Sequence, residues 1–503
     1  MRTPKLFSSK ISLFCGLFTL LVLQAFSQKS VPGSVLQNIE KTNDSTTLFF
    51  YSSVGAPDSE FEVLDLTSRI SFNSTYPRGY NDGPVWKGKG LTLEVHGGVA
   101  GKKGKFSYQF MPVVFFSQNS PFELAPRNSS VESQFAYQFT DQVDWVQRYG
   151  SSSSLFFHPG QSEIKFQTGK FVTSLSTQNY SVGPSFFNPI LLSQQGGGFP
   201  HLRIGSTPFS IGKIGIFEVN ALGGVLIESD HFDNDSENDS RIFNGLFINY
   251  SPGFLKNLKV GFGKVLYKQT RYFEFEDAFA LITILEDEGR EGLSRTSNDS
   301  FDQLASFSLE WSFPEVGFRA YTEFAKNDFT GSFRGTLIEP EHTRGYTIGF
   351  EKVVKTKKQK EIKILYEHTN LSHNQAWLWR ATPSFYTHNL NTQGYSNAGQ
   401  LLGAGIGPGG NADNLMIDIK NTNGTRLNFH FQRIEHNRDY FTRNETIRSI
   451  NNHDVEYSLG TAFLKELERL DFFGEMMLSH NFQRYYSGDR TNLFIAFGFR
   501  LDL

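Results

Sequence analysis

The segment from residue 366 to residue 410 combines aromatic side chains with histidines, asparagines and an arginine. It reads YEHTNLSHNQAWLWRATPSFYTHNLNTQGYSNAGQLLGAGIGPGG. Tryptophan and tyrosine rings can stack on the apolar faces of sugar rings, and asparagine, histidine and arginine can hydrogen-bond sugar hydroxyls. The side chains that we expect to contact a carbohydrate are Trp377, Trp379, Arg380, Tyr386 and His388. The alternative for each of them is aromatic packing that holds a long loop closed.

Two acidic segments are the other places where chemistry could occur. Residues 231–239 read HFDNDSEND; their alternating oxygens suit a calcium ion, but the glycine and closing glutamate of an EF-hand are missing. A solvated loop is the alternative. Residues 274–291 contain Glu286 and Asp287, which have the residue types of a hydrolase acid pair but no convergent partner position. The sequence also lacks a Gly-x-Ser-x-Gly elbow and a His-Glu-x-x-His helix. We therefore expect no enzyme activity, no metal site and no cofactor.

Strands are the elements that must position these segments. Residues 491–503 alternate between an apolar face, Leu493 to Leu503, and a face that includes Arg500 and Asp502. This alternation is typical of a strand with one apolar face. Such segments recur along the chain, and bacterial single-chain barrels have even strand numbers, so we expect roughly 16 or 18 strands. The predicted strands are 65–73, 91–99, 105–118, 162–177, 201–211, 214–229, 241–251, 258–269, 303–313, 316–327, 343–355, 360–371, 413–421, 425–438, 455–465, 470–486 and 491–503, with 46–52 as a possible further strand.

The first 27 residues have the pattern of a secretory signal peptide. Three basic residues precede an apolar run that ends at Ala25-Phe26-Ser27, so we expect cleavage before Gln28. The only cysteine, Cys15, lies in this segment, which excludes disulfides and cysteine-ligated metals from the exported chain. Loss of the three basic residues lowers the formal net charge from −3 to −6. A chain without basic excess is not expected to bind nucleic acid.

The composition favours an outer-membrane barrel over a soluble β-sandwich, which would bury its apolar faces from both sides. The chain has 51 Phe, 19 Tyr and 46 Gly, yet its mean hydropathy is −0.35. That mixture suits strands whose alternate residues face lipid and water. No apolar run after residue 27 approaches the roughly 20 residues of a membrane helix. We predict an all-β fold, a transmembrane antiparallel barrel whose lumen is occluded by loops. The predicted organisation is a signal peptide at 1–27, a loosely ordered segment with a possible first strand at 28–60, and the barrel at 61–503.

One connection is expected to enter the barrel. Residues 182–203 read VGPSFFNPILLSQQGGGFPHLR, with irregular backbone at Gly196 to His201 and a short helix expected at 188–195. Leu191 and Leu192 would pack inward from that helix. Because loops cannot face lipid, the segment must lie inside the lumen or cap it. A constriction loop without a ligand is the alternative interpretation.

Four segments occur in a characteristic order: YPRGYNDGPVWKGKG (76–90), PGQSEI (159–164), GPSFFNPILLSQQGGGFPH (183–201) and YTHNLNTQGYSNAGQLLGAGIGPGG (386–410). Together they resemble the successive blocks of the Wzi-type capsule assembly family of outer-membrane proteins. The resemblance implies a closed barrel of about 18 strands. It also implies a lectin-like role that holds capsular polysaccharide or exopolysaccharide at the cell surface. The residues that carry it are Tyr80, Asn81, Asp82, Gly83, Trp86, Gly183, Pro184, Phe199, Pro200, His201, Gly394 and Tyr395.

Three functions compete at this point. The leading hypothesis is an integral outer-membrane barrel, in contact with membrane lipid, that binds surface polysaccharide and does no chemistry. The second is a diffusion porin or another outer-membrane channel, because a barrel this wide has an aqueous lumen unless loops fill it. The third is an outer-membrane enzyme, which would need a nucleophile, a base and an acid within hydrogen-bond reach in one cleft.

Overall fold

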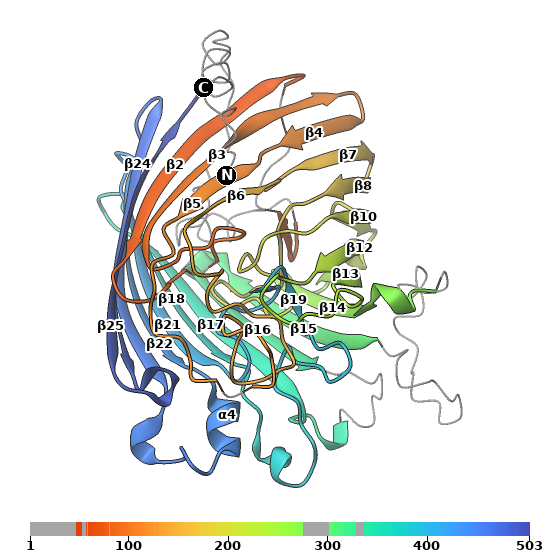
Figure 1. Ribbon diagram of the computed structural model, residues 1–503. Coiled ribbons are helices and arrows are strands. Elements are labelled where there is room, and N and C mark those ends of the chain that lie inside the picture. Colours follow the sequence, from red (N-terminus) through yellow and green to blue (C-terminus); the bar gives the residue numbers. More distant parts are fainter. Residues whose placement is uncertain are drawn as a thin grey trace, which may run out of the picture.

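The computed structural model describes residues 47–52, 57, 59–79, 81–127, 129–274, 301–327 and 337–503. Within these residues, 21 hydrogen-bonded strand segments close into a barrel (Figure 1). In three places two successive segments are the halves of one strand, so the wall has 18 antiparallel strands.

Each of these three interruptions contains a proline, at Pro112, Pro159 and Pro208, because proline cannot donate a ladder hydrogen bond. The wall segments are β2 (Glu62–Asn73), β3 (Gly90–Lys103), β4 (Phe106–Phe110), β5 (Val113–Ser117), β6 (Ser154–His158), β7 (Glu163–Thr168), β8 (Phe171–Ser176), β10 (His201–Ser206), β11 (Phe209–Ile211), β12 (Gly215–Ile227), β13 (Ser240–Pro252), β14 (Leu258–Gln269), β15 (Asp302–Phe313), β16 (Phe318–Asn327), β17 (Arg344–Lys355), β18 (Glu361–Asn370), β21 (Asn411–Lys420), β22 (Thr425–Glu435), β23 (Val455–Lys465), β24 (Leu470–Phe482) and β25 (Arg490–Leu501).

The last strand seals the wall against the first. β25 pairs with β24 on one side and with β2 on the other, where Leu501 lies opposite Leu66. Its apolar face points outward: Ile495 and Phe497 are 43% and 46% exposed, whereas Ala496 is buried. The alternation of the C-terminal segment therefore predicted both the strand and its orientation correctly.

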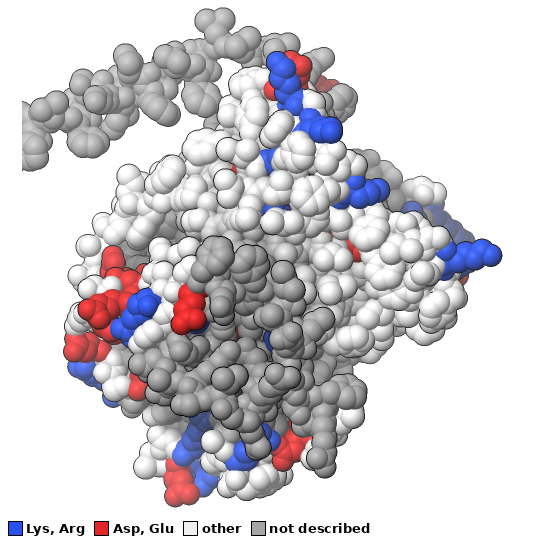
Figure 2. Space-filling view, turned by 90° about the vertical axis from the view of Figure 1, so that its right-hand side faces the viewer, with Lys and Arg blue, Asp and Glu red and all other residues white. Residues whose placement is uncertain are grey.

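The outside of the barrel is apolar along the strands. Leu155, Phe157, Ile164 and Leu175 are among the most exposed large side chains, with more than half of each accessible. In Figure 2 most of the charged side chains lie toward the margins of the face, and the surface seen above and to the right of the grey atoms is largely uncharged. A lipid-facing band flanked by polar ends has this pattern.

The two ends of the barrel carry connections of different length. Because neighbouring strands are antiparallel, the tight turns at 104–105, 212–214 and 421–424 lie at the end where β2 begins and β25 ends. The long loops lie at the opposite end, together with helix α4 (Arg438–Arg443) (Figure 1). Long loops of bacterial barrels face the cell exterior, and short turns face the periplasm.

Three segments far apart in sequence fill the lumen, and we call them the plug: residues 47–52, 180–200 and 393–410. β1 (Phe50–Ser52) pairs with β9 (Tyr180–Val182), and β19 (Ser396–Asn397) pairs with β20 (Gln400–Leu401). Side chains of the plug pack with inward-facing wall residues in one buried cluster, in which Phe50 contacts the ring of Phe247 at 5.6 Å. The prediction of a lumen occluded by loops is confirmed.

Four local predictions differ from the structure. The predicted strand 162–177 is a hairpin, β7 and β8, and β6 lies between the predicted strands 105–118 and 162–177. Residues 50–52 do form a strand, but it pairs with β9 inside the plug and does not extend the wall. The segment 188–195 has turns and bends but no helix, although Leu191 and Leu192 are buried as expected.

Several predicted features lie outside the described residues. These are the signal peptide at 1–27, Tyr80 and the acid pair at Glu286 and Asp287. None of the helices in the described ranges combines the length and the apolar composition that a membrane crossing requires.

Candidate functional site

A buried glutamate of the wall holds the central part of the plug. Glu367 lies on the inward face of β18 and is 0% exposed. Its carboxylate accepts hydrogen bonds from the backbone N–H groups of residues 186–188, at 2.6 Å from Phe186 N and 2.8 Å from Asn188 N. The Tyr321 hydroxyl donates to the same carboxylate at 2.7 Å. Irregular backbone inside the lumen thus obtains hydrogen-bond acceptors that a helix or sheet would otherwise supply.

Two other wall carboxylates act in the same way. Glu323 accepts from the backbone N–H of Ile190 at 3.2 Å. Glu218 accepts from the backbone N–H of Leu48 at 2.9 Å and from the Thr47 hydroxyl at 2.7 Å. The plug is therefore fixed to the inside of β12, β16 and β18 by buried carboxyl groups that accept hydrogen bonds from its backbone.

The loop between β2 and β3 is joined to the plug. The N–H of Gly83 donates to Gln194 O at 2.8 Å, and the Gln400 side chain donates to Gly83 O at 3.0 Å. The same glutamine accepts from the N–H of Gly197 at 2.9 Å. Gly83 has a φ of 61°, a left-handed conformation that favours glycine. Three of the four sequence blocks therefore meet at one point.

The fourth block meets them through Asn179. Gln161 of PGQSEI donates to Asn179 Oδ1 at 2.9 Å, and Asn179 Oδ1 also accepts from the N–H of Gly198 at 3.1 Å. Gly198 is required there, because a Cβ atom would overlap the carbonyl oxygen of Thr177. The four sequence blocks, which are distant from one another in the chain, thus form one connected structure.

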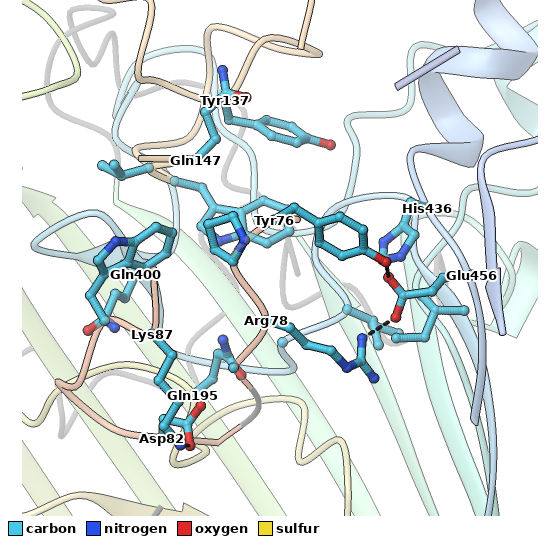
Figure 3. A pocket seen from close by; sticks show the side chains of 18 of the residues that line it. Tyr76, Arg78, Asp82, Lys87, Tyr137, Gln147, Gln195, Gln400, His436 and Glu456 are labelled. Atoms are coloured by element: carbon cyan, nitrogen blue, oxygen red, sulfur yellow. Dashed lines mark hydrogen bonds and ion pairs between the residues drawn. The ribbon is translucent and has the colours of Figure 1, made fainter. Parts of the chain in front are cut away.

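A cavity of about 200 Å³ lies between this structure and the wall at the long-loop end. One side is formed by the 76–87 loop, another by residues 137–149, and the rest by plug residues and the outer ends of β22 to β24 (Figure 3). Both aromatic rings and polar groups line it. The charged and aromatic side chains of its lining are those of Tyr76, Arg78, Asp82, Trp86, Lys87, Tyr137, Trp145, Tyr149, His436, Asp454, Glu456, Arg484 and Tyr485.

Glu456 organises one wall of the cavity. The Tyr76 hydroxyl donates to its carboxylate at 3.2 Å, and Arg78 forms an ion pair with it, as Figure 3 shows. Arg78 also donates to Gln432 Oε1 at 2.7 Å. Burial and the nearby Glu456 carboxylate raise the pKa of the Tyr76 hydroxyl, which therefore stays protonated as a donor.

The opposite wall is aromatic. The ring of Trp86 meets the ring of Tyr149 edge-on at 5.1 Å, and the rings of Tyr137 and Trp145 lie 5.0 Å apart. The indole Nε1 of Trp86 and Nε2 of His436 are buried and have no hydrogen-bond partner within the described part of the chain. A buried donor without a partner costs about 1–3 kcal/mol, so a bound hydroxyl that reached either atom would recover part of that cost.

The charges around the cavity are largely compensated. Lys87 forms an ion pair with Asp82, and both side chains are almost completely buried. Burial raises the pKa of Asp82, although Lys87 acts in the opposite direction. Asp454 accepts from Asn437 Nδ2 at 3.1 Å, and burial raises the pKa of this carboxyl as well.

The residues predicted to contact a carbohydrate are dispersed and do not line this cavity in the described structure. Tyr386 is 0% exposed, and its hydroxyl donates to Ile190 O at 2.7 Å. Trp379 is 70% exposed on an outer loop, and Arg380 beside it forms an exposed ion pair with Glu339. The remaining two lie on the same outer loop: Trp377 packs on His373, with ring centroids 5.4 Å apart, and His388 Nδ1 accepts from Asn391 N at 3.0 Å. Their roles as sugar contacts stay a prediction.

The family-signature residues are mostly structural. Gly183 N donates to Phe49 O at 3.0 Å, and the Tyr395 hydroxyl donates to Leu191 O at 2.8 Å. Phe199 and His201 are buried at the start of β10. Asp82 and Trp86 are the signature residues, among those described, that line the cavity; Asn81, Pro184, Pro200 and Gly394 have no place in its lining.

Sequence reasoning missed the cavity residues outside the signature set. Tyr76 and Arg78 lie in the first sequence block but outside the signature set, and the predicted strand 470–486 includes Arg484 and Tyr485. The available signal for these cavity residues was a basic residue beside two tyrosines, just before the last strand.

The acidic segment 231–239 forms a loop of side-chain-capped turns. Asp233 Oδ1 accepts from Asp235 N at 2.8 Å, and Asp235 Oδ1 accepts from Glu237 N at 3.1 Å. Among the described residues, no group of three or more histidines and acids is placed to hold a metal ion.

Comparison with known proteins shows the fold. No family model and no curated protein matches the sequence. Wzi of Escherichia coli, a carbohydrate-binding outer-membrane barrel involved in Group 1 capsule assembly, superposes with a TM-score of 0.57 at 12% identity, over 88% of this chain and 85% of Wzi. OccD3 of Pseudomonas aeruginosa superposes with a TM-score of 0.42 at 10% identity, over 95% of this chain and 100% of OccD3. OccAB2 of Acinetobacter baumannii superposes with a TM-score of 0.41 at 11% identity, over 88% of this chain and 97% of OccAB2. Scores below 0.5 support no inference. The resemblance to the Wzi-type family stays a prediction, and the chain has the fold of an outer-membrane β-barrel.

Proposed function

We propose that this protein binds a polysaccharide at the cell surface, in the cavity between the plug and β22 to β24, and does so without a chemical step. The observation that carries the proposal is the composition of the cavity. Four tryptophan and tyrosine rings, of Trp86, Tyr137, Trp145 and Tyr149, pair across one side of it. Fixed hydrogen-bonding groups line the other side, which suits a ligand with an apolar ring face and many hydroxyls.

The position and rigidity of the cavity also support binding. It lies at the end of the barrel with the long loops, which face the exterior in bacterial barrels. Its walls are held by the plug, so little side-chain freedom is lost when a ligand binds, and preorganisation of this kind favours affinity. The resemblance of four sequence blocks to the Wzi-type family, and the likeness in fold to a carbohydrate-binding barrel, point in the same direction.

The competing function, a diffusion channel, needs a continuous aqueous path. The plug residues Ile190, Leu191 and Tyr395 are 0% exposed where such a path would run, which argues against it. Planar-bilayer recordings of the purified barrel test this point: silence is expected, and steady large openings would favour the channel.

The binding proposal is tested with two matched tryptophan variants. Trp86→Ala changes the cavity, whereas Trp379→Ala changes an exposed outer loop. Polysaccharide extracted from the producing cells is titrated onto each purified barrel, and retention of polymer on cells is measured in parallel. Trp86→Ala is expected to lower affinity and release polymer into the medium, with Trp379→Ala close to the parent. Equal loss in both variants would move the site to the outer loops, and no binding by the parent would refute the proposal.

A further inference from the structure

Arg484 differs from the other basic side chains of the cavity. Arg78 is paired with Glu456, and Lys87 is paired with Asp82. The Arg484 guanidinium instead lies over the ring of Tyr76 and the ring of Tyr485, 4.1 Å from each centroid. Within the described residues, no carboxylate oxygen lies within the 4.0 Å of an ion pair with Arg484. Its one side-chain hydrogen bond, from Nη2 to the Tyr485 hydroxyl at 2.8 Å, leaves further N–H groups of the fork to bind a ligand.

The loop that carries Arg484 is held in a costly conformation. Gln483, Tyr485 and Tyr486 have φ values of 50°, 55° and 61°, in the left-handed region. For residues other than glycine each such position costs roughly 1–3 kcal/mol and persists only where the surroundings impose it. Here the surroundings do so: Tyr485 N donates to Asp454 Oδ2 at 3.0 Å, and the Tyr486 hydroxyl donates to Asn437 O at 2.9 Å. Strain of this kind concentrates at functional sites.

We propose that the cavity recognises an acidic sugar unit of the polysaccharide, whose carboxylate pairs with the guanidinium of Arg484. The inference rests on the proposed function and narrows its ligand to an anionic polymer. Arginine binds carboxylates through two parallel N–H···O hydrogen bonds. The rings of Tyr76 and Tyr485 lie over the guanidinium, and the Tyr485 hydroxyl accepts from one of its N–H groups, which leaves the other N–H groups for such a pair.

The nearby acids Asp454 and Glu456 attract this cation, but neither forms a close ion pair with it, and each has other partners. Glu456 is already paired with Arg78, and Asp82 with Lys87. Asp454, the remaining acid of the lining, is buried and hydrogen-bonded to Asn437 and to the backbone of Tyr485. Burial raises the pKa of Asp454, although the nearby His436 and Arg484 act in the opposite direction.

The experiment compares one polymer with and without its carboxylates. Surface polysaccharide from the producing cells is used as extracted and after carbodiimide-activated borohydride reduction, which converts uronic acids to neutral sugars. Both forms are titrated onto the full-length purified barrel and onto Arg484→Gln, Arg484→Lys and Arg490→Gln. Arg490 is the matched control, because it borders the same loop but pairs with Glu123 outside the cavity.

Carboxyl reduction is expected to weaken binding to the parent at least tenfold. Arg484→Gln should bind the native polymer more weakly than the parent does, by the same factor. It should bind the reduced polymer with the same affinity as the parent. Arg484→Lys should retain part of the affinity, and Arg490→Gln nearly all of it. Equal binding of both polymers by the parent, or a loss in Arg484→Gln that persists on the reduced polymer, would overturn the acidic-sugar inference while leaving polysaccharide binding intact. No binding of either polymer by a folded barrel would overturn both.

Discussion

Replacing Glu367 with glutamine is expected to loosen the plug. Four donor groups point at this buried carboxylate: the backbone N–H groups of residues 186–188 and the hydroxyl of Tyr321. A glutamine side chain has one acceptor oxygen with two lone pairs and turns an NH₂ group toward the remaining donors. At least two of the four hydrogen bonds are therefore lost.

The size of the effect follows from those two hydrogen bonds. A hydrogen bond to a charged group contributes roughly 1.5–3 kcal/mol, so the plugged state should lose about 3–6 kcal/mol. This is an upper bound, because glutamine also avoids the desolvation of a buried carboxylate. Each 1.4 kcal/mol is a factor of about ten, so the ratio of open to plugged barrels should rise by up to about a hundredfold to ten-thousandfold.

Two measurements report the open state. Single-channel recordings should show brief openings in Glu367→Gln that the parent lacks. A cysteine introduced at Leu192, buried in the plug, should react faster with a water-soluble maleimide when Glu367→Gln is also present; Cys15 in the predicted signal peptide is the only other cysteine. Glu361→Gln, at the start of the same strand, is the control. If Glu367→Gln conducts and reacts no more than this control, the carboxylate does not hold the plug.

Three further predictions concern the loops and the plug. Asp82→Asn should destabilise the 76–90 loop by about 3–5 kcal/mol, because it removes the charge that pairs with buried Lys87. The rate of proteolysis should rise, and adding Lys87→Met should restore most of the resistance to proteolysis. Gly198→Ala should lower the yield of folded barrel on heat-modifiable electrophoresis, because its Cβ would overlap the Thr177 carbonyl oxygen; an unchanged yield would contradict the packing. Burial raises the pKa of Glu228 to about 7, above the ordinary value of 4.5, so its contribution to stability is complete below pH 4.5 and is lost as the pH rises through 7. Hydrogen exchange in its loop, corrected for intrinsic rates, should therefore accelerate between about pH 5 and 8 in the parent and not in Glu228→Gln.

The wall could be predicted because lipid and water impose a period of two on almost every strand. The one hairpin read as a strand shows how the pattern can mislead. Outward residues are even-numbered in β7, as at Ile164, and odd-numbered in β8, as at Leu175. That change of phase across Gly169-Lys170 marked a two-residue turn. β6 is only five residues long and stands beside Pro159, so its alternation was too short to separate from the preceding loop.

The cavity was harder to predict because its residues come from separate outer loops. Tyr76 follows the first wall strand and Arg484 precedes the last, 408 positions apart in numbering, yet the guanidinium lies 4.1 Å from the ring centroid. A closed barrel pairs its last strand with its first, so the predicted closure already implied that these two loops are neighbours. Which side chains turn into the cavity could not be inferred, because the plug decides that through backbone contacts such as Gly83 with Gln194.

The seam between β2 and β25 couples ligand binding to closure of the barrel. Until these strands pair, both are edge strands, and their pairing closes the longest loop in the chain, from Leu66 to Leu501. Tyr76 and Arg484 stand on opposite sides of this seam, so the complete cavity exists only in the closed barrel. A ligand that binds the closed form alone stabilises it in proportion to the logarithm of its concentration. Polymer bound across the seam would therefore act as a clasp that slows the reopening of the barrel.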